Sequence, residues 1–175
     1  GLLPVGTAIM EMAAASGIEL VSHEQLNPLD ATTYGTGEIL RHLLDEGHTS
    51  IVMGIGGSAT VDGGVGMAQA LGFRFLDEDG IEIIDRGGKI LSRIHTVETS
   101  AACPQLAKAN IRIACDVTNP LTGPQGAACI FGPQKGATPE MVKQLDAGLD
   151  NLRNVLGMNE APGDPDSAES LAFPP

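Results

Sequence analysis

Residues 54–64 combine glycines with hydroxyl and carboxyl side chains, in the order Gly-Ile-Gly-Gly-Ser-Ala-Thr-Val-Asp-Gly-Gly. Glycine lets backbone amides approach an anion without a Cβ atom in the way, and successive amides can form an anion-binding nest. The carboxylate of Asp62 is a candidate Mg²⁺ ligand or general base, whereas a tight turn that only permits close packing is the structural alternative. We expect these residues to bind substrate or phosphate: Gly56, Gly57, Ser58, Thr60, Gly63 and Gly64.

A second polar segment, residues 114–124, follows an apolar run and reads Ala-Cys-Asp-Val-Thr-Asn-Pro-Leu-Thr-Gly-Pro. Asp116 falls just past the predicted strand end, where α/β folds place functional side chains. Asp116 and Asn119 are therefore candidates to bind a metal ion or substrate hydroxyl groups, with Asp116 as a second catalytic carboxylate. Asp and Asn before a proline-containing turn are equally typical of side chains that cap their own backbone.

A lysine, Lys135, lies in a Gly/Pro loop immediately before the clearest helix of the sequence. A positive charge beside a helix N-terminus is unfavourable unless an anion lies between them. Lys135 is therefore a candidate ligand for a phosphate or carboxylate, and a solvated loop lysine is the alternative.

These three segments must be positioned by an α/β fold, because short apolar strands alternate with amphipathic helices. The clearest helix begins at Thr138, with Pro139 in its first turn and leucines at helical spacing up to the terminator Gly157. The other predicted helices cover 36–47, with Thr36 as N-cap, and 65–71. The predicted strands cover residues 7–12, 50–53, 73–76, 81–84 and 111–115. We expect one domain over 1–157 and a flexible, acidic, Pro-rich tail over 158–175.

The amino-acid composition disfavours some classes of binding partner. The formal net charge of −12 disfavours nucleic acids and anionic membranes, and no apolar run approaches the ~20 residues that span a bilayer. Three cysteines without a CxxC spacing predict neither a disulfide framework nor a zinc site. A reducing, cytoplasmic setting is the simpler expectation.

A looser dinucleotide-binding fingerprint competes with these interpretations. Gly54, Gly56 and Ala59 match G-x-G-x-x-A after a strand, and Asp77 follows about 20 residues later. This pattern favours an NAD-dependent oxidoreductase. Against it, Gly63 and Gly64 interrupt the helix that the fingerprint requires, at a cost of roughly 1 kcal/mol each.

Four stretches together resemble the type I glycerate kinase family over residues 10–157. They read IMEMAAASGIELV, NPLDATTYGTGEIL, IVMGIGGSATVDGGVGMAQALG and ACDVTNPLTGPQGAACIFGPQKGATPE. The resemblance implies a kinase that uses ATP and Mg²⁺ to phosphorylate a hydroxyl of D-glycerate. It also implies a mixed sheet with flanking helices, corresponding to the inserted second domain of a two-domain enzyme. By the same resemblance the Gly56–Gly64 loop, the turn from Asp116 to Asn119 and Lys135 lie at or near the cleft.

The chain departs from the family pattern in ways that affect activity. Val61 stands where the family has Asn in SATNDGG, and neither the N-terminal Asp-Ser-Phe-Lys-Gly motif nor the Gly/Ala-rich region expected beyond residue 160 is found. The missing N- and C-terminal segments of the kinase are therefore expected partners. We expect little or no kinase activity from this chain alone, and an inactive binding or scaffold fragment is the alternative function.

Overall fold

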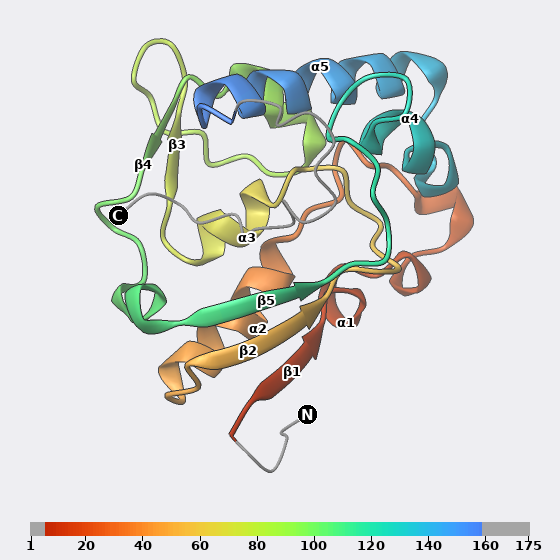
Figure 1. The fold of residues 1–175 in the computed structure, drawn as a ribbon. Coiled ribbons are helices and arrows are strands. Elements are labelled where there is room, and N and C mark those ends of the chain that lie inside the picture. The colour runs from red at the N-terminus through yellow and green to blue at the C-terminus, as the bar shows by residue number, and fades with distance from the viewer. Residues whose placement is uncertain (1–5, 159–175) are drawn as a thin grey trace.

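The computed structural model describes residues 6–158, and its centre is a three-stranded parallel sheet (Figure 1). The strands are β1 (Ala8–Glu11), β2 (Ser50–Gly54) and β5 (Asn110–Ala114), in the order β1-β2-β5. Their register aligns Ala8 with Ile51 and Ile51 with Ile111, so that the carboxyl ends of all three strands meet at one edge. The predicted α/β class is confirmed.

Helices cover one face of this sheet. Side chains alternate along the strands, and Ala8, Met10, Ile51 and Met53 are buried on the covered face. Helix α2 (Tyr34–Asp45) contributes buried Leu40 and Leu44 to the same core. The short helices α1 (Ala13–Ser16) and α3 (Val65–Ala70) complete this layer, and α2 lies behind the strands in Figure 1.

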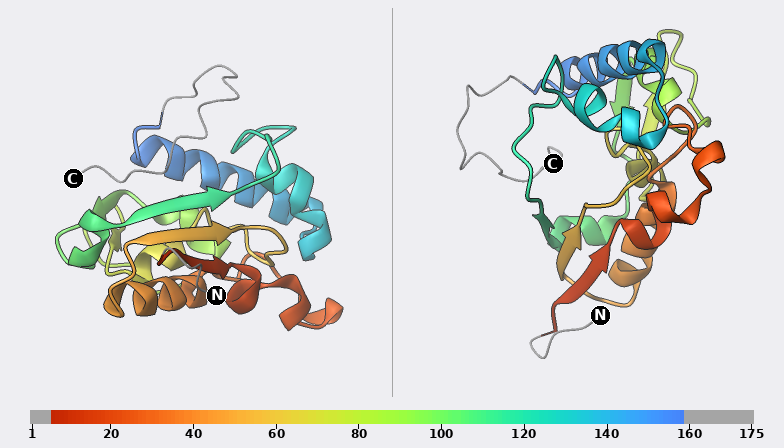
Figure 2. Two further views of the ribbon diagram at one scale, coloured as in Figure 1. Left: turned by 60° about the horizontal axis from the view of Figure 1, so that its bottom comes forward. Right: turned by 90° about the vertical axis from the view of Figure 1, so that its right-hand side faces the viewer.

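A second layer forms around helix α5 (Pro139–Val155), whose leucine stripe packs on the 3-10 helix Gly88–Arg93. It includes helix α4 (Ala127–Phe131) and an antiparallel pair of β3 (Arg74–Leu76) and β4 (Thr96–Glu98). Figure 2 shows α4 and α5 at one end of the molecule and β1 with α2 at the other. The predicted helix from Thr138 is confirmed, because Thr138 is its N-cap and accepts a hydrogen bond from the Met141 amide.

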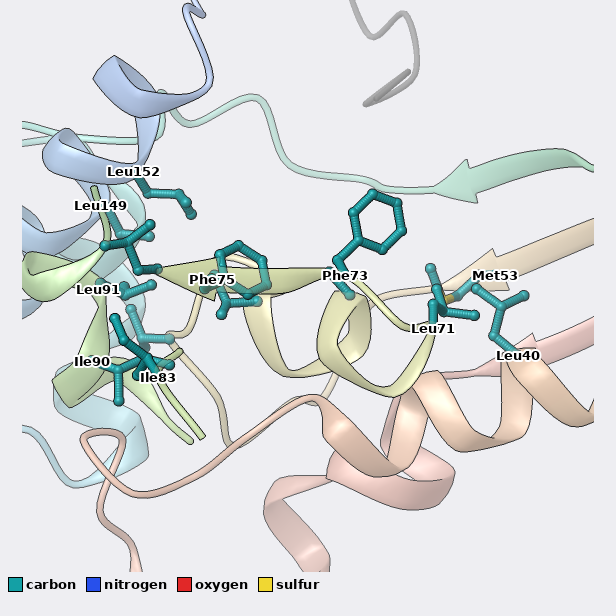
Figure 3. Close-up of a cluster of buried hydrophobic side chains, with 14 of the residues drawn as sticks. Leu40, Met53, Leu71, Phe73, Phe75, Ile83, Ile90, Leu91, Leu149 and Leu152 are labelled. Atoms are coloured by element: carbon teal, nitrogen blue, oxygen red, sulfur yellow. The ribbon is translucent and has the colours of Figure 1, made fainter. Parts of the chain in front are cut away.

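One continuous hydrophobic core joins the two layers. In Figure 3 buried side chains run from Leu40 and Met53, through Phe73 and Phe75, to Leu149 of α5. Aliphatic residues and the two phenylalanines supply this core, since the sequence contains no Trp and a single Tyr. No described helix is both long enough and apolar enough to cross a bilayer.

Two predicted elements are wrong in detail. Helix α2 begins after Thr33 rather than Thr36, and Thr36 is buried in its first turn with Oγ1 2.8 Å from Ser16 Oγ. Residues 81–84 form only a single bridge, Leu76 to Glu82, instead of a strand. The partner of β3 is β4, which the sequence pattern did not predict; the short helix α4 was also missed.

The expected tail over 158–175 lies outside the described residues except for Met158.

The strand β5 and the segment after it are unusually open. Every residue of 112–120 is exposed, including Val117, and Ile113 is 43% exposed although it points to the same face as the buried Met53. Parallel sheets are normally covered on both faces and rarely end in such a strand. In the described part of the chain, β5 pairs only with β2.

Gly37 of α2 packs closely against α3, and it supplies a stability test. An added Cβ would lie 2.5 Å from the Met67 carbonyl oxygen and 2.7 Å from Ala70 Cβ, so the helices would have to separate. We expect Gly37→Ala to lower the free energy of unfolding by about 1–3 kcal/mol in urea denaturation, despite the better helix propensity of alanine. The exposed Glu38→Ala on the same helix is the control, and equal stabilities of the two variants would contradict this packing.

Candidate functional site

A cavity of about 700 Å³ opens at the carboxyl ends of β2 and β5. Open α/β sheets bind ligands at this edge, because the loops that leave the strands diverge there. Two chain segments form most of its wall, the loop after β2 and the segment after β5, and the 3-10 helix Pro133–Lys135 completes it. Its lining residues are Ile18, Ile55, Gly56, Gly57, Ser58, Cys115, Asp116, Val117, Asn119, Pro120, Leu121, Ala127, Phe131, Gln134 and Lys135.

The loop after β2 places three consecutive residues, Gly56, Gly57 and Ser58, in the wall of the cavity. Gly57 adopts φ +70°, a conformation that favours glycine. An antiparallel bridge fixes the loop on the chain after α1: the Ile18 amide donates to the Gly57 carbonyl and the Ala59 amide to the Ser16 carbonyl, both at 2.8 Å. The amides of Gly56, Gly57 and Ser58 donate to no other described residue. Anion binding by these amides, which the sequence suggests, stays a prediction.

Lys135 reaches into this loop from a distant part of the chain. Its side chain is buried, with the residue 9% exposed, and Nζ donates to Ser58 Oγ at 2.9 Å and to the Thr60 carbonyl at 2.7 Å. Burial lowers the pKa of Lys135 to about 8, and the nearby Asp62 carboxylate opposes this shift. The interpretation of Lys135 as a solvated loop residue is therefore wrong, and a buried ammonium group faces the cavity.

Asp116 and Asn119 line the opposite side, on the segment that leaves β5. Asn119 Nδ2 donates to the Gln125 carbonyl at 2.9 Å, which fixes the side chain and leaves its Oδ1 atom for a ligand. Asp116 is exposed and makes no hydrogen bond to another described residue. It is the only carboxylate among the residues that line the cavity.

Asp62, in contrast, lies in the interior and does not line the cavity. Its carboxylate accepts hydrogen bonds from the Thr33 amide at 2.8 Å and Thr33 Oγ1 at 2.9 Å, and more distant ones from Thr32 Oγ1 and from the amides of Gly64 and Gly66. Burial raises the pKa of Asp62, and the hydrogen bonds from Thr33, Gly64 and Gly66 act in the opposite direction. Because every partner is a donor, this environment accommodates the ionised carboxylate.

The remaining predicted site residues support the loop from outside the cavity. Thr60 contributes its carbonyl to Lys135, and Gly63, with φ +58°, packs against α5, where an added Cβ would lie 2.6 Å from Leu152 Cδ2. Gly64, with φ +78°, precedes α3. Val61, the departure from the family pattern, is buried in the core and absent from the cavity lining. The structure thus brings six of the ten predicted residues to the cavity: Gly56, Gly57, Ser58, Asp116, Asn119 and Lys135.

Several lining residues were missed by sequence reasoning. Ile18, Phe131 and Gln134 carry no functional signal of their own, and only their closeness to the loop or to Lys135 could have indicated them. Cys115 lies directly beside Asp116, and its thiol is exposed.

The sequence suggests two cofactors, Mg²⁺ and NAD, and the site residues fit them unequally. The described residues contain no cluster of three or more His, Cys, Asp or Glu side chains that would hold a metal ion by itself. Mg²⁺, however, is commonly bound by one or two protein oxygens together with substrate phosphates and water, a role that fits Asp116 and Asn119. The dinucleotide fingerprint fits poorly, because β3 lies in a different sheet from β2 and Asp77 Oδ1 accepts the amides of Asp79 and Ile81 in a turn.

The placement of Asp62 predicts a role in stability. We expect Asp62→Asn to lower the free energy of unfolding by roughly 3 kcal/mol, because an amide NH₂ would replace an acceptor among buried donors. Urea denaturation monitored by circular dichroism measures the effect. Asp116→Asn is the matched control, and its exposed side chain predicts a change within about 0.5 kcal/mol. Equal stabilities for the two variants would disprove the structural assignment.

Comparison with known proteins finds several glycerate kinases that are similar to this chain. The chain is 55% identical over 149 residues to the glycerate kinase of Haemophilus influenzae and 51% identical over 150 residues to the glycerate 2-kinase of Escherichia coli K12. These matches cover 85% and 86% of this chain but only 39% of each relative. A crystal structure from Salmonella typhimurium LT2, named for glycerate kinase 2, matches 90% of this chain and 42% of its own, with a TM-score of 0.86 and 49% identity. Because the model of the Glycerate kinase family also matches residues 1–167, the chain belongs to the glycerate kinase family.

Proposed function

We propose that this chain forms part of a kinase that transfers the γ-phosphate of ATP to a hydroxyl group of D-glycerate with the help of Mg²⁺. The observation that carries the proposal is the pairing, across one cavity, of an anion-binding corner and a carboxylate. The corner consists of the Gly56–Ser58 amides and Lys135, and the carboxylate is Asp116. Relatives named glycerate kinase support glycerate as the acceptor, and the family resemblance suggests ATP and Mg²⁺.

Phosphoryl transfer needs positioning and charge neutralisation more than covalent chemistry from the protein. Asp116 accepts the hydrogen of the substrate hydroxyl and orients its oxygen toward the phosphoryl group. Asp116 and Asn119 Oδ1 are the side-chain oxygens that would hold Mg²⁺, which supplies charge neutralisation to the phosphates when bound. Asp62, the other carboxylate expected to act in catalysis, is assigned in this proposal to the support of the loop.

The rest of the cavity wall is proposed to come from polypeptide outside this chain. The chain spans 39% of the length of the curated relatives that it matches, and the segment 112–120 beside the cavity is exposed throughout. Chain segments that in the relatives lie outside the matched region would cover this segment and complete the site. On this proposal the chain alone has little or no kinase activity. By itself it would therefore behave as an inactive binding fragment, the alternative function suggested by the sequence.

A reducing cytoplasmic setting is also proposed, on the state of the cysteines. Cys103, Cys115 and Cys129 are all free thiols, and Cys115 is exposed at the cavity. Exposed thiols persist in compartments where thiols are kept reduced.

A chimeric enzyme tests the proposed function. Residues of the Haemophilus influenzae relative that match this chain are replaced by the sequence of this chain, and ADP formation is measured with D-glycerate and Mg-ATP. We expect an active chimera, and we expect Asp116→Asn in it to lower kcat/KM by a factor of roughly 10²–10⁴, as for loss of an acid–base group.

Lys143→Met serves as the control substitution, because this exposed lysine of α5 lies outside the cavity. A folded chimera without activity would refute the proposal. Full activity in the Asp116→Asn chimera would refute the role of that carboxylate.

A further inference from the structure

We propose that the corner formed by the Gly56–Ser58 amides and the Lys135 ammonium group binds the carboxylate of the hydroxy-acid substrate. The phosphates of ATP then occupy the part of the cavity beside Asp116 and Asn119. This inference rests on the proposed function and decides which of the two substrates the glycine-rich loop holds.

The hydrogen-bonding capacity of Lys135 suits one small acceptor. An ammonium group has three hydrogens, and Lys135 directs two of them to Ser58 Oγ and the Thr60 carbonyl. One hydrogen is left for a ligand. The amides of Gly56, Gly57 and Ser58 add at most three further donors. Together with the remaining hydrogen of Lys135 they make four donors, which matches the four acceptor positions of a single carboxylate group.

The charge of the cavity also suits a monoanion. Among its lining residues only Lys135 is positively charged and only Asp116 is negatively charged. These two charges cancel over the whole lining, but the corner itself contributes only the positive charge of Lys135, which balances one carboxylate. A triphosphate carries several negative charges, and charge balance would require a metal ion and further cations, which this corner does not supply.

The immobility of Lys135 favours a ligand that must be held in a fixed orientation. Its two hydrogen bonds connect it to both ends of the loop segment Ser58–Thr60, and its residue is almost fully buried. Apolar side chains of Ile18, Ile55 and Phe131 line the same cavity and suit the carbon skeleton of a small acid. A carboxylate anchored at this corner leaves the hydroxyl end of the acid free to reach toward the β5 side of the cavity.

Amide NMR on this chain tests where each ligand binds, with D-glycerate, glycerol, inorganic phosphate and Mg-ATP as the probes. We expect D-glycerate to shift the amide signals of Gly56, Gly57 and Ser58 in a saturable way, and glycerol, which lacks the carboxylate, to leave them unchanged. Mg-ATP is expected to shift signals of the segment 115–119 instead. Lys135→Met is expected to weaken D-glycerate binding by about tenfold or more, because a charge-assisted hydrogen bond is lost.

Folding of the variants is checked first by the dispersion of the same spectra, and Lys143→Met is the matched lysine control. If Lys135→Met does not fold, Ser58→Ala provides the second variant. It removes the hydroxyl that positions Lys135 and is expected to weaken D-glycerate binding while leaving Mg-ATP binding unchanged.

The dependence of D-glycerate affinity on pH is a second, independent readout. The carboxyl group of the ligand stays ionised above neutral pH, whereas Lys135, with a pKa of about 8 in the free site, loses its charge as the pH rises. Affinity is therefore highest below pH 8 and falls above it by up to about tenfold per pH unit. The other titratable groups near Lys135 are Asp62, Asp116 and Cys115; Cys115→Ala should keep this pH dependence, and Lys135→Met should abolish it.

The outcomes separate this inference from the proposed function. Displacement of D-glycerate from the Gly56–Ser58 amides by phosphate or Mg-ATP would overturn the inference and leave the kinase function standing. Unchanged D-glycerate affinity in a folded Lys135→Met variant would also overturn it. An absence of saturable shifts with every ligand, together with an inactive chimera, would overturn both.

Discussion

A buried carboxylate, that of Asp62, holds together the parts of the chain that shape the site. It receives donors from the residues that precede α2, from Gly64 before α3 and from Gly66 in the first turn of α3. Thr33 Oγ1 also accepts the Met67 amide, so one threonine links the carboxylate to both helices. A buried charge without its donors is costly, so the arrangement of loop and helices around Asp62 is favoured as a unit.

Lys135 extends this constraint to the second layer of the fold. Its ammonium group binds the loop close to Asp62, and its backbone belongs to the connection between α4 and α5. The position of α5 is set independently by its leucine stripe, which packs on the 3-10 helix Gly88–Arg93. The ammonium group is therefore held in place from both sides. The pKa of Lys135 is lowered because its ammonium group is buried in this position.

Local patterns were sufficient to predict the elements whose signals lie within one stretch of sequence. The helix that begins at Thr138, the buried strand β2 and the glycine-rich turn after it all follow from cap, periodicity and glycine spacing. The role of Asp62 was not predictable in this way, because its strongest donors come from Thr33, 29 residues earlier in the chain. Residues 81–84 were wrongly predicted as a strand for the same reason. The partner of β3 is β4, about 20 residues further on, and local patterns do not reveal such a pairing. The burial of Lys135 depends on a contact across 77 residues.

The exposed edge of β5 has a consequence for how this chain behaves in solution. Its backbone presents unpaired donors and acceptors on the outer side in the described part of the chain, next to the exposed side chains of Ile113 and Val117. Such an edge is a template for strand addition between molecules, and no proline or inward-pointing charge interrupts Asn110–Ala114. Arg112 supplies the strand's only formal charge, and the acidic surface elsewhere adds repulsion between copies. If copies of this chain pair through β5, added salt is therefore expected to favour that pairing, because it screens the repulsion.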